Sequence, residues 1–219
     1  MARPFRNFTG FLPVTMQGHH RYVRKFVNVK LSTMSSRLTL ISHAATAAVR
    51  AAAFPLDEGI DEAGKRDAEA LASSFRPFRA VWTSPLKRAI ETAAALNLDA
   101  EVEPALSDID LGRWAGRTFS QVEAEEPEEI ARWLLDPALA PHGGESIAEL
   151  TARVSEWLTS VGQNRGHIAA VSHPAVIRAA IVAAIEANPI SFWRIDIAPL
   201  CIVELRSNGQ RWALRSIRS

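Results

Sequence analysis

Two histidines in this 219-residue chain stand where an apolar stretch gives way to an alanine-rich one. His43 follows "RLTLIS" (37–42), and His173 follows "HIAAVS" (167–172). Both stretches are typical of buried strands, and helices are expected to follow them. Arg88 is expected one turn into another helix that follows a strand. Two imidazoles and a guanidinium at helix starts suit a phosphate, because one imidazole can attack phosphorus while the other groups stabilise the charge on its oxygens.

The pattern of strand and helix signals predicts what positions these side chains. Ser84 is predicted to cap a helix with Pro85 in its first turn, and Ser146 with Glu149 forms a capping box. The other signals are an amphipathic helix over 61–75, helical residues 118–135 interrupted at Pro127, and a hairpin turning at Asn208-Gly209. Because strands alternate with helices, the predicted fold class is α/β, in three layers (α/β/α) around a mainly parallel sheet. Ligands bind beyond the carboxyl ends of the strands in such a sheet.

Composition narrows the class of protein. Apolar residues make up 47% of the chain, enough for a real core in one α/β domain or two small ones. The single cysteine, Cys201, lies in an apolar run and is interpreted as a buried structural thiol. One cysteine cannot form an internal disulfide, so a reducing compartment, the cytoplasm, is expected. No stretch approaches the ~20 apolar residues of a membrane span.

The charge is distributed unevenly along the chain. Residues 1–36 hold six basic side chains and no acid, which leaves 19 basic against 24 acidic side chains in the remainder, a net charge of −5. A mildly acidic body argues against nucleic acid as a partner. The basic segment lacks the apolar centre of a secretory signal. It is interpreted as a disordered tail or as the product of translation upstream of a true start at Met34. An organellar presequence is the alternative. Residues 37–219 are expected to form the domain.

Five segments, taken together and in this order, resemble the histidine phosphatase superfamily, which has the phosphoglycerate-mutase-like fold. They are "LTLISHAAT", "VWTSPLKRAIETA", "LSDIDLGRWAG", "HGGES" and "AAVSHPAVIRAAI". The second of these is the most specific. The resemblance covers the chain from about residue 37 to the last strand. Residues 113–142 correspond to the helical cap of that family, from which substrate specificity is expected to come.

The resemblance implies a role for each matched residue. His43 falls at the nucleophile that becomes a phosphohistidine, and His173 at the second histidine, which stabilises the transferred group. Arg88 falls at an arginine that binds the phosphate. Asp108, four residues before Gly112, falls at the general acid. Ser84 and Glu145 are expected to support these groups. No metal or organic cofactor is implied.

Some positions depart from the family pattern. Ser42 stands where the family has an arginine, whose charge and bidentate geometry a hydroxyl cannot replace. A catalytic arginine contributes roughly 10³ to 10⁵ in rate in other phosphoryl-transfer enzymes. Ala44, Ala45, Val49 and Pro174 also differ from the usual residues. Arg50 is the nearest cation that can restore the charge, although it is about two helical turns from His43.

Simpler interpretations remain open for each residue. His43 and His173 can be ordinary buried histidines, or can bind a metal with Asp108 or Glu145. Arg88 can pair with Glu58 or Glu91 on the surface. Asp108 and Asp110 can be loop acids. His142 can line the mouth of the site, while Trp114, Trp133 and Trp157 are more typical of packing.

The favoured function is that of a phosphomonoesterase that acts on a small phosphorylated substrate through His43. Its activity is expected to be weak if the arginine that Ser42 replaces is needed for catalysis. The alternative is a catalytically degenerate module that keeps the phosphate pocket for binding or scaffolding. A mutase is less favoured, because only 27 residues separate Gly116 from Gly144 and mutases of this family usually carry a longer insertion there. The natural substrate and the oligomeric state do not follow from the sequence.

Overall fold

The computed structural model describes residues 36–219, so the predicted basic extension lies outside the described residues apart from Ser36, which begins the first strand. The strands are β1 Ser36–Ser42, β2 Ala80–Thr83, β3 Glu101–Val102, β4 Gly166–Ser172, β5 Ile202–Ser207 and β6 Trp212–Arg218. The helices are α1 Ala47–Arg50, α2 Glu62–Leu71, α3 Lys87–Ala95, α4 Phe119–Glu125, α5 Pro127–Leu135, α6 Ile147–Gly162 and α7 Pro174–Ala184. Short 3₁₀ turns include η2 Pro104–Leu106, η3 Gly112–Trp114 and η4 Pro189–Arg194.

The strands form one sheet in the order β3-β2-β4-β1-β5-β6. The pairs β3–β2, β2–β4 and β4–β1 are parallel, while β5 runs antiparallel to both β1 and β6. The predicted α/β fold class with a mainly parallel sheet is confirmed. Parallel pairing aligns the ends of neighbouring strands, and Ser42 at the end of β1 lies opposite Ser172 at the end of β4.

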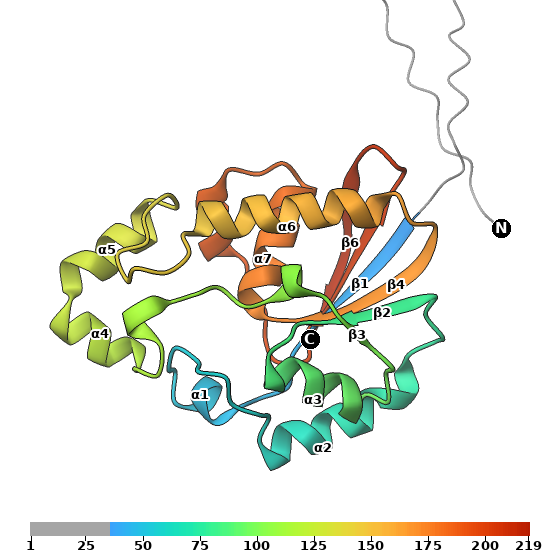
Figure 1. The fold of residues 1–219 in the computed structure, drawn as a ribbon, viewed down its shortest axis with the longest axis horizontal. Helices are drawn as coiled ribbons and strands as arrows, with labels where there is room; N and C mark the ends of the chain where they lie inside the picture. The colour runs from blue at the N-terminus through green and yellow to red at the C-terminus, as the bar shows by residue number, and fades with distance from the viewer. Residues whose placement is uncertain (1–35) are drawn as a thin grey trace, which may run out of the picture. The chain divides into compact units, whose positions relative to one another are not determined.

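Helices cover both faces of the sheet (Figure 1): α2 and α3 lie on one face, α6 and α7 on the other, and α4 and α5 stand apart from it. Alternation along β1 explains the two apolar layers, because successive side chains point to opposite faces. Leu38 and Leu40 belong to the larger cluster, with residues of α6 and α7. Ile41 belongs to the smaller cluster, with residues of α2 and α3. Burying each such side chain stabilises the fold by about 1.5–3 kcal/mol.

Local signals locate most element ends. The capping box of Ser146 and Glu149 opens α6, Pro127 begins α5 after a break, and the chain turns between β5 and β6 around Asn208-Gly209, all as predicted. The prediction that Ser84 caps a helix was wrong by two residues, because the N-cap of α3 is Leu86. The helix starts at Lys87, because Leu86 keeps an extended backbone and the Ser84 hydroxyl accepts the Leu86 N–H outside the helix.

The helix expected after β1 is only one turn long. Thr46 caps α1, and its hydroxyl accepts the N–H of Val49. Ala52 then takes a left-handed φ of 48°, which ends the helix. The backbone around His43 is therefore part of a loop that packs on α2, where a Cβ on Gly64 would stand 2.5 Å from the Ala45 carbonyl oxygen. Within residues 36–219, no helix has both the length and the apolar character to cross a membrane.

Candidate active site

His43 and His173 lie side by side at the carboxyl ends of β1 and β4. The backbone N–H of His43 donates to the Ser172 carbonyl at 2.8 Å, and this bond continues the parallel pairing of β1 and β4 by one residue. The two rings are tilted by 58° with centroids 5.3 Å apart, and both side chains are buried. The aligned ends of neighbouring parallel strands thus bring together two histidines that are 130 residues apart in the sequence.

His43 is held as a neutral imidazole whose Nε2 has no hydrogen-bond partner within residues 36–219. Its Nδ1 lies 2.8 Å from the Ala44 carbonyl oxygen, which can only accept, so Nδ1 carries the proton. Burial lowers the pKa of His43, and this effect outweighs the bond to Ala44, which acts to raise it. The Nε2 lone pair is therefore available to an electrophile near neutral pH.

Arg88 is buried beneath the two histidines and donates to three protein acceptors. Its Nε donates to Nδ1 of His173 at 3.2 Å, and one Nη donates to the Leu56 carbonyl at 2.8 Å. The other Nη donates to Asp108 at 2.6 Å. A guanidinium has five N–H donors, so two remain for a ligand. The structure thus places Arg88 in the site rather than in a surface pair with Glu58 or Glu91.

His173 is fixed by Arg88 on one nitrogen and by Ser84 on the other. Because Nδ1 accepts from Arg88, Nε2 carries the proton and donates to the Ser84 hydroxyl at 2.7 Å. Burial, its largest influence, lowers the pKa of His173 to about 3. The ring therefore contributes oriented polarity without a full charge.

Asp108 closes this group from the loop that follows β3. Its carboxylate pairs with Arg88 and lies 3.4 Å from Nδ1 of His173. Burial acts to raise the pKa of Asp108, but the neighbouring His173 and Arg88 outweigh it and lower that pKa. We call these four side chains, His43, Arg88, Asp108 and His173, the histidine centre.

The loop that carries Asp108 is interlocked with the loop that precedes α6. A Cβ on Gly112 would stand 2.2 Å from the His142 carbonyl oxygen, and a Cβ on Gly144 would stand 2.1 Å from that of Asp110. Two backbone bonds cross here, from Arg113 N–H to His142 and from Glu145 N–H to Asp110. Only glycine permits this approach, which accounts for the "LGRWAG" and "HGGES" segments.

Comparison with known proteins identifies this arrangement. The family model described as "Histidine phosphatase superfamily (branch 1)" matches residues 38–219. The chain belongs to the histidine phosphatase superfamily. The match includes both histidine segments and the segments that carry Arg88 and Asp108.

Relatives of this chain include proteins named as enzymes and a larger protein. Phosphoserine phosphatase 1 of Hydrogenobacter thermophilus is 33% identical over 63% of this chain and 70% of its own length. A bifunctional protein of Mycobacterium tuberculosis is 34% identical over 69% of this chain, which spans only 44% of that protein. The native structure of mycobacterial glucosyl-3-phosphoglycerate phosphatase superposes with a TM-score of 0.73 at 25% identity, covering 82% of this chain and 97% of that one.

The other predicted site residues of this chain lie in different surroundings. Ser42 is fully buried at the end of β1, and its hydroxyl has no partner among the described residues. Arg50 does not join the histidine centre: its guanidinium is largely exposed and forms a bidentate pair with Asp61, the residue that caps α2. The proposed replacement of the missing charge by Arg50 therefore has no support in the structure.

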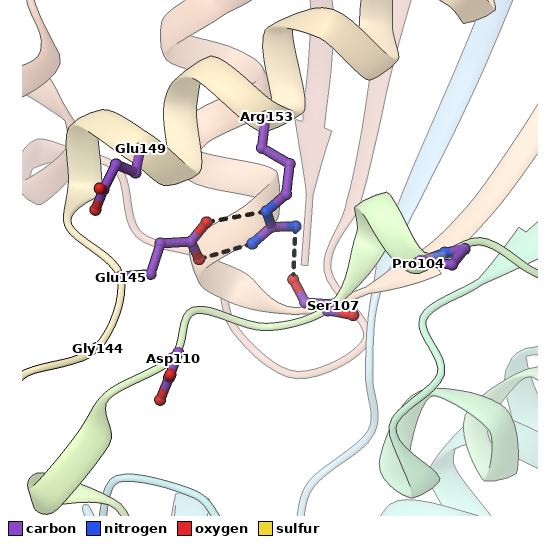
Figure 2. Close-up of a pocket in the computed structure, with 7 residues that line it drawn as sticks. All are labelled: Pro104, Ser107, Asp110, Gly144, Glu145, Glu149 and Arg153. Carbon is purple, nitrogen blue, oxygen red and sulfur yellow. Dashed lines mark hydrogen bonds and ion pairs between the residues drawn. The ribbon is translucent and has the colours of Figure 1, made fainter.

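Glu145 supports the loops rather than the histidines. It accepts two bonds from Arg153 of α6, at 2.9 and 2.7 Å, and Arg153 also donates to the Ser107 carbonyl (Figure 2). Arg153 donates to the Ala105 carbonyl as well. Glu145, Arg153 and Ser107 line a pocket of about 610 Å³ that contains no member of the histidine centre. Asp110 also lines it, and its carboxylate accepts the Gly112 N–H.

Sequence reasoning missed several supporting groups. It did not identify the Leu56 carbonyl or Arg153. It also did not identify the Thr92 hydroxyl, which accepts the Ala44 N–H. Thr92 was the most accessible of these, since it follows Arg88 by one helical turn and its hydroxyl also donates to the Arg88 carbonyl. Within residues 36–219, no three His, Cys, Asp or Glu side chains are placed to hold a metal ion.

Proposed function

We propose that this protein hydrolyses small phosphomonoesters through a phosphohistidine on His43. The observation that carries the proposal is the pair of neutral, buried imidazoles 5.3 Å apart, with one nitrogen of His43 free. A phosphate between them can be reached by the remaining Arg88 donors. Relatives named as phosphatases of phosphoserine and of glucosyl-3-phosphoglycerate support the reaction class and a small phosphorylated substrate.

The first half-reaction transfers the phosphoryl group to the protein. Nε2 of His43 attacks phosphorus, the N–P bond forms, and the ester P–O bond breaks. Asp108 donates a proton to the departing oxygen, so the organic part leaves as an alcohol. Arg88 and the oriented His173 ring stabilise the charge on the equatorial oxygens. The hydrogen bond of Nδ1 to the Ala44 carbonyl stabilises the positive charge that develops on the His43 ring.

The second half-reaction returns the protein to its starting state. A water molecule attacks phosphorus, Asp108 accepts one of its protons, and the N–P bond breaks. Inorganic phosphate leaves, and His43 is again neutral. Each cycle consumes one ester and one water and yields one alcohol and one phosphate.

Asp108 must hold a proton at the start of this cycle. In the free protein Arg88 and His173 lower its pKa, which favours the ionised form. A bound phosphate places negative charge beside Asp108 and competes for Arg88, and both effects raise the Asp108 pKa. Substrate binding is thus the event that prepares the acid.

The direct test is a screen of generic and metabolic phosphomonoesters, with His43→Ala as the blank. Turnover that depends on His43, together with an acid-labile, alkali-stable phosphoryl group on the wild-type protein, is the expected result. Turnover that survives His43→Ala would overturn the mechanism. The cytoplasm remains the expected compartment, from the single, buried cysteine.

A catalytically degenerate phosphate-binding module is the second candidate. The observation that favours it is Ser42, a neutral and fully buried residue adjacent to the proposed nucleophile. In that case phosphate would bind to the wild-type protein in calorimetry, while no monoester in the screen would be hydrolysed.

A further inference from the structure

Arg178 is a half-buried cation that the proposed mechanism does not use. It lies on α7, five residues after His173, with its guanidinium carbon 5.7 Å from the centre of the Phe192 ring. Its Nε is buried and has no hydrogen-bond partner among the described residues. A buried N–H without a partner carries an energetic cost that is tolerated where a ligand completes the bond.

The charge of Arg178 is only weakly balanced by carboxylates of the described residues. Its nearest carboxylate is Asp196, at 3.9 Å, and that side chain is 99% exposed to solvent. Burial lowers the pKa of Arg178, and the two carboxylates that oppose this are Asp196 and Asp108. Arg178 lies on α7, the helix whose N-cap is His173. His142 accepts a backbone bond from Arg113, in the loop that follows Asp108, so both Arg178 and His142 are connected to elements of the histidine centre.

Three further unpartnered nitrogens lie in the same region. Trp193 and Trp133 each bury an indole N–H, and His142 buries Nε2, with no partner for any of them within residues 36–219. The His142 Nδ1 accepts the Gly144 N–H, and burial lowers the pKa of His142, so its Nε2 carries a hydrogen. Like the Arg178 Nε, all three are hydrogen-bond donors.

Ring contacts connect these donors into one continuous cluster. From α7 the contacts run from Arg178 to Phe192, then to Trp193 at 4.9 Å, Trp133 at 4.5 Å and His142 at 5.9 Å between ring centroids. The cluster joins η4 to α5 and to the end of the predicted cap. We call Arg178, Trp193, Trp133 and His142 the donor cluster.

We propose that the donor cluster binds a second anionic group, a carboxylate or a second phosphate, on the organic part of the substrate, with Arg178 as its main contact. The inference rests on the proposed function and narrows its substrate class. A cluster made of donors alone fits a ligand made of acceptors, and Nε with one Nη of arginine matches two oxygens of one anion. The aromatic rings exclude water, which strengthens that contact.

Substrates matched in size but not in charge test the assignment. We would compare 3-phosphoglycerate with glycerol 1-phosphate, which has CH₂OH in place of the carboxylate, and fructose 1,6-bisphosphate with fructose 6-phosphate. The wild-type protein should prefer the anionic member of at least one pair by about 10- to 100-fold in kcat/KM. The pair that shows the preference distinguishes a carboxylate from a second phosphate.

Arg178→Gln should reduce this preference to within about 3-fold and leave the neutral member nearly unchanged. Trp193→Phe, which keeps the ring and removes one N–H, should reduce it by a smaller factor. Arg132→Gln is the control, because that arginine is exposed on α5 and, among the described residues, pairs only with Glu129. No preference in the wild type, or an equal loss on both members in Arg178→Gln protein that melts like the wild type, would overturn the assignment.

A binding measurement separates this inference from the proposed function. Calorimetry of the same four compounds with His43→Ala, and with His43→Ala/Arg178→Gln, needs no turnover. A preference that depends on Arg178 in this assay, without hydrolysis by the wild type, would support the donor cluster and reject the phosphatase. Equal affinities for all four compounds in both proteins would reject the donor cluster, whatever the wild type hydrolyses.

Discussion

The histidine centre and the donor cluster are both buried and polar, but they differ in how their hydrogen bonds are satisfied. In the histidine centre, Arg88 donates to three acceptors, and His173 is bonded through both ring nitrogens. In the donor cluster, four nitrogens have no partner among the described residues. One region is organised by its own bonds, whereas the other leaves donors that a ligand can complete.

This difference suggests a division of labour. Chemistry requires groups held in one geometry, which mutual bonds supply before the substrate arrives. Recognition requires donors that are free until the correct ligand binds and that reject a ligand without acceptors. Substitutions in the histidine centre should therefore change rate and stability together, and those in the donor cluster should change substrate preference.

The largest effect is expected for His43→Ala. Removing the nucleophile should lower kcat/KM on the best monoester by about 10³-fold or more. Single-turnover kinetics and capture of the phosphoryl group on the protein would measure this loss. If the variant kept more than a tenth of wild-type activity, His43 would not be the nucleophile, and the histidine centre would not be the place where the reaction occurs.

Arg88→Gln should affect both rate and stability. It removes the cation of the buried pair with Asp108, which should lower the free energy of unfolding by about 3–5 kcal/mol. We also expect kcat/KM to fall by roughly 10²-fold or more. Urea denaturation and steady-state kinetics give the two values.

Arg50→Gln is the matched control for Arg88→Gln. It removes the same charge from an exposed pair with Asp61 and should leave both stability and rate nearly unchanged. Adding Asp108→Asn to Arg88→Gln should restore part of the stability, because the unpaired carboxylate is then neutral. A double variant no more stable than Arg88→Gln would show that the buried pair is not the cause.

Ser42→Arg should raise kcat/KM on a generic monoester by about 10-fold or more. The residue is adjacent to the proposed nucleophile, and a guanidinium there would add charge to a site in which Arg88 acts with two neutral imidazoles. The gain should disappear when His43→Ala is added.

Arg50 forms an ion pair with Asp61, so it is not expected to affect a guanidinium introduced by Ser42→Arg. Ser42→Arg/Arg50→Ala should therefore behave like the single variant. No change in either protein, with normal thermal melting, would mean that the missing charge does not limit catalysis and would favour the binding module.

The most gradual effect is expected from pH. The folded pKa of His43 lies below its ordinary value of 6.5, and that of His173 is about 3. As pH falls below 6.5, the unfolded chain binds protons at both residues before the folded chain does, so folding stability is lost. Each group contributes at most about 1.4 kcal/mol per pH unit.

Urea denaturation between pH 7.5 and 5 measures this slope. In His43→Gln/His173→Gln the slope should be shallower by the contribution of these two residues. An unchanged slope would show that the two rings titrate alike in the folded and unfolded chains, contrary to their burial.

His43, Arg88 and His173 could be predicted together from the sequence because each lies near a strand-to-helix junction, whereas Asp108 was assigned only by the family resemblance. His43 and His173 each follow a strand, and parallel pairing aligns strand ends whatever the loops between them do. Arg88 lies in the site even though the N-cap of its helix is Leu86 rather than Ser84. An error of two residues at the helix start does not matter when the side chain is long.

Arg50 and the donor cluster could not be predicted in this way. The direction of Arg50 depends on the left-handed turn at Ala52, which no glycine marks in the sequence. The members of the donor cluster come from α5, a loop, α7 and η4, and each alone resembles an ordinary core or surface residue. Their shared lack of partners is a property of the packed chain only.

The glycine crossing between residues 110–112 and 142–144 gives the molecule a modular construction. The two ends of the predicted cap are held together by two neighbouring backbone hydrogen bonds, one between Arg113 and His142 and the other between Asp110 and Glu145. Asp108 lies just outside these bonds. The segment between the two glycines can therefore be lengthened, shortened or exchanged without moving Asp108, the proposed proton donor. A change in this segment can alter substrate preference while the histidine centre keeps its geometry.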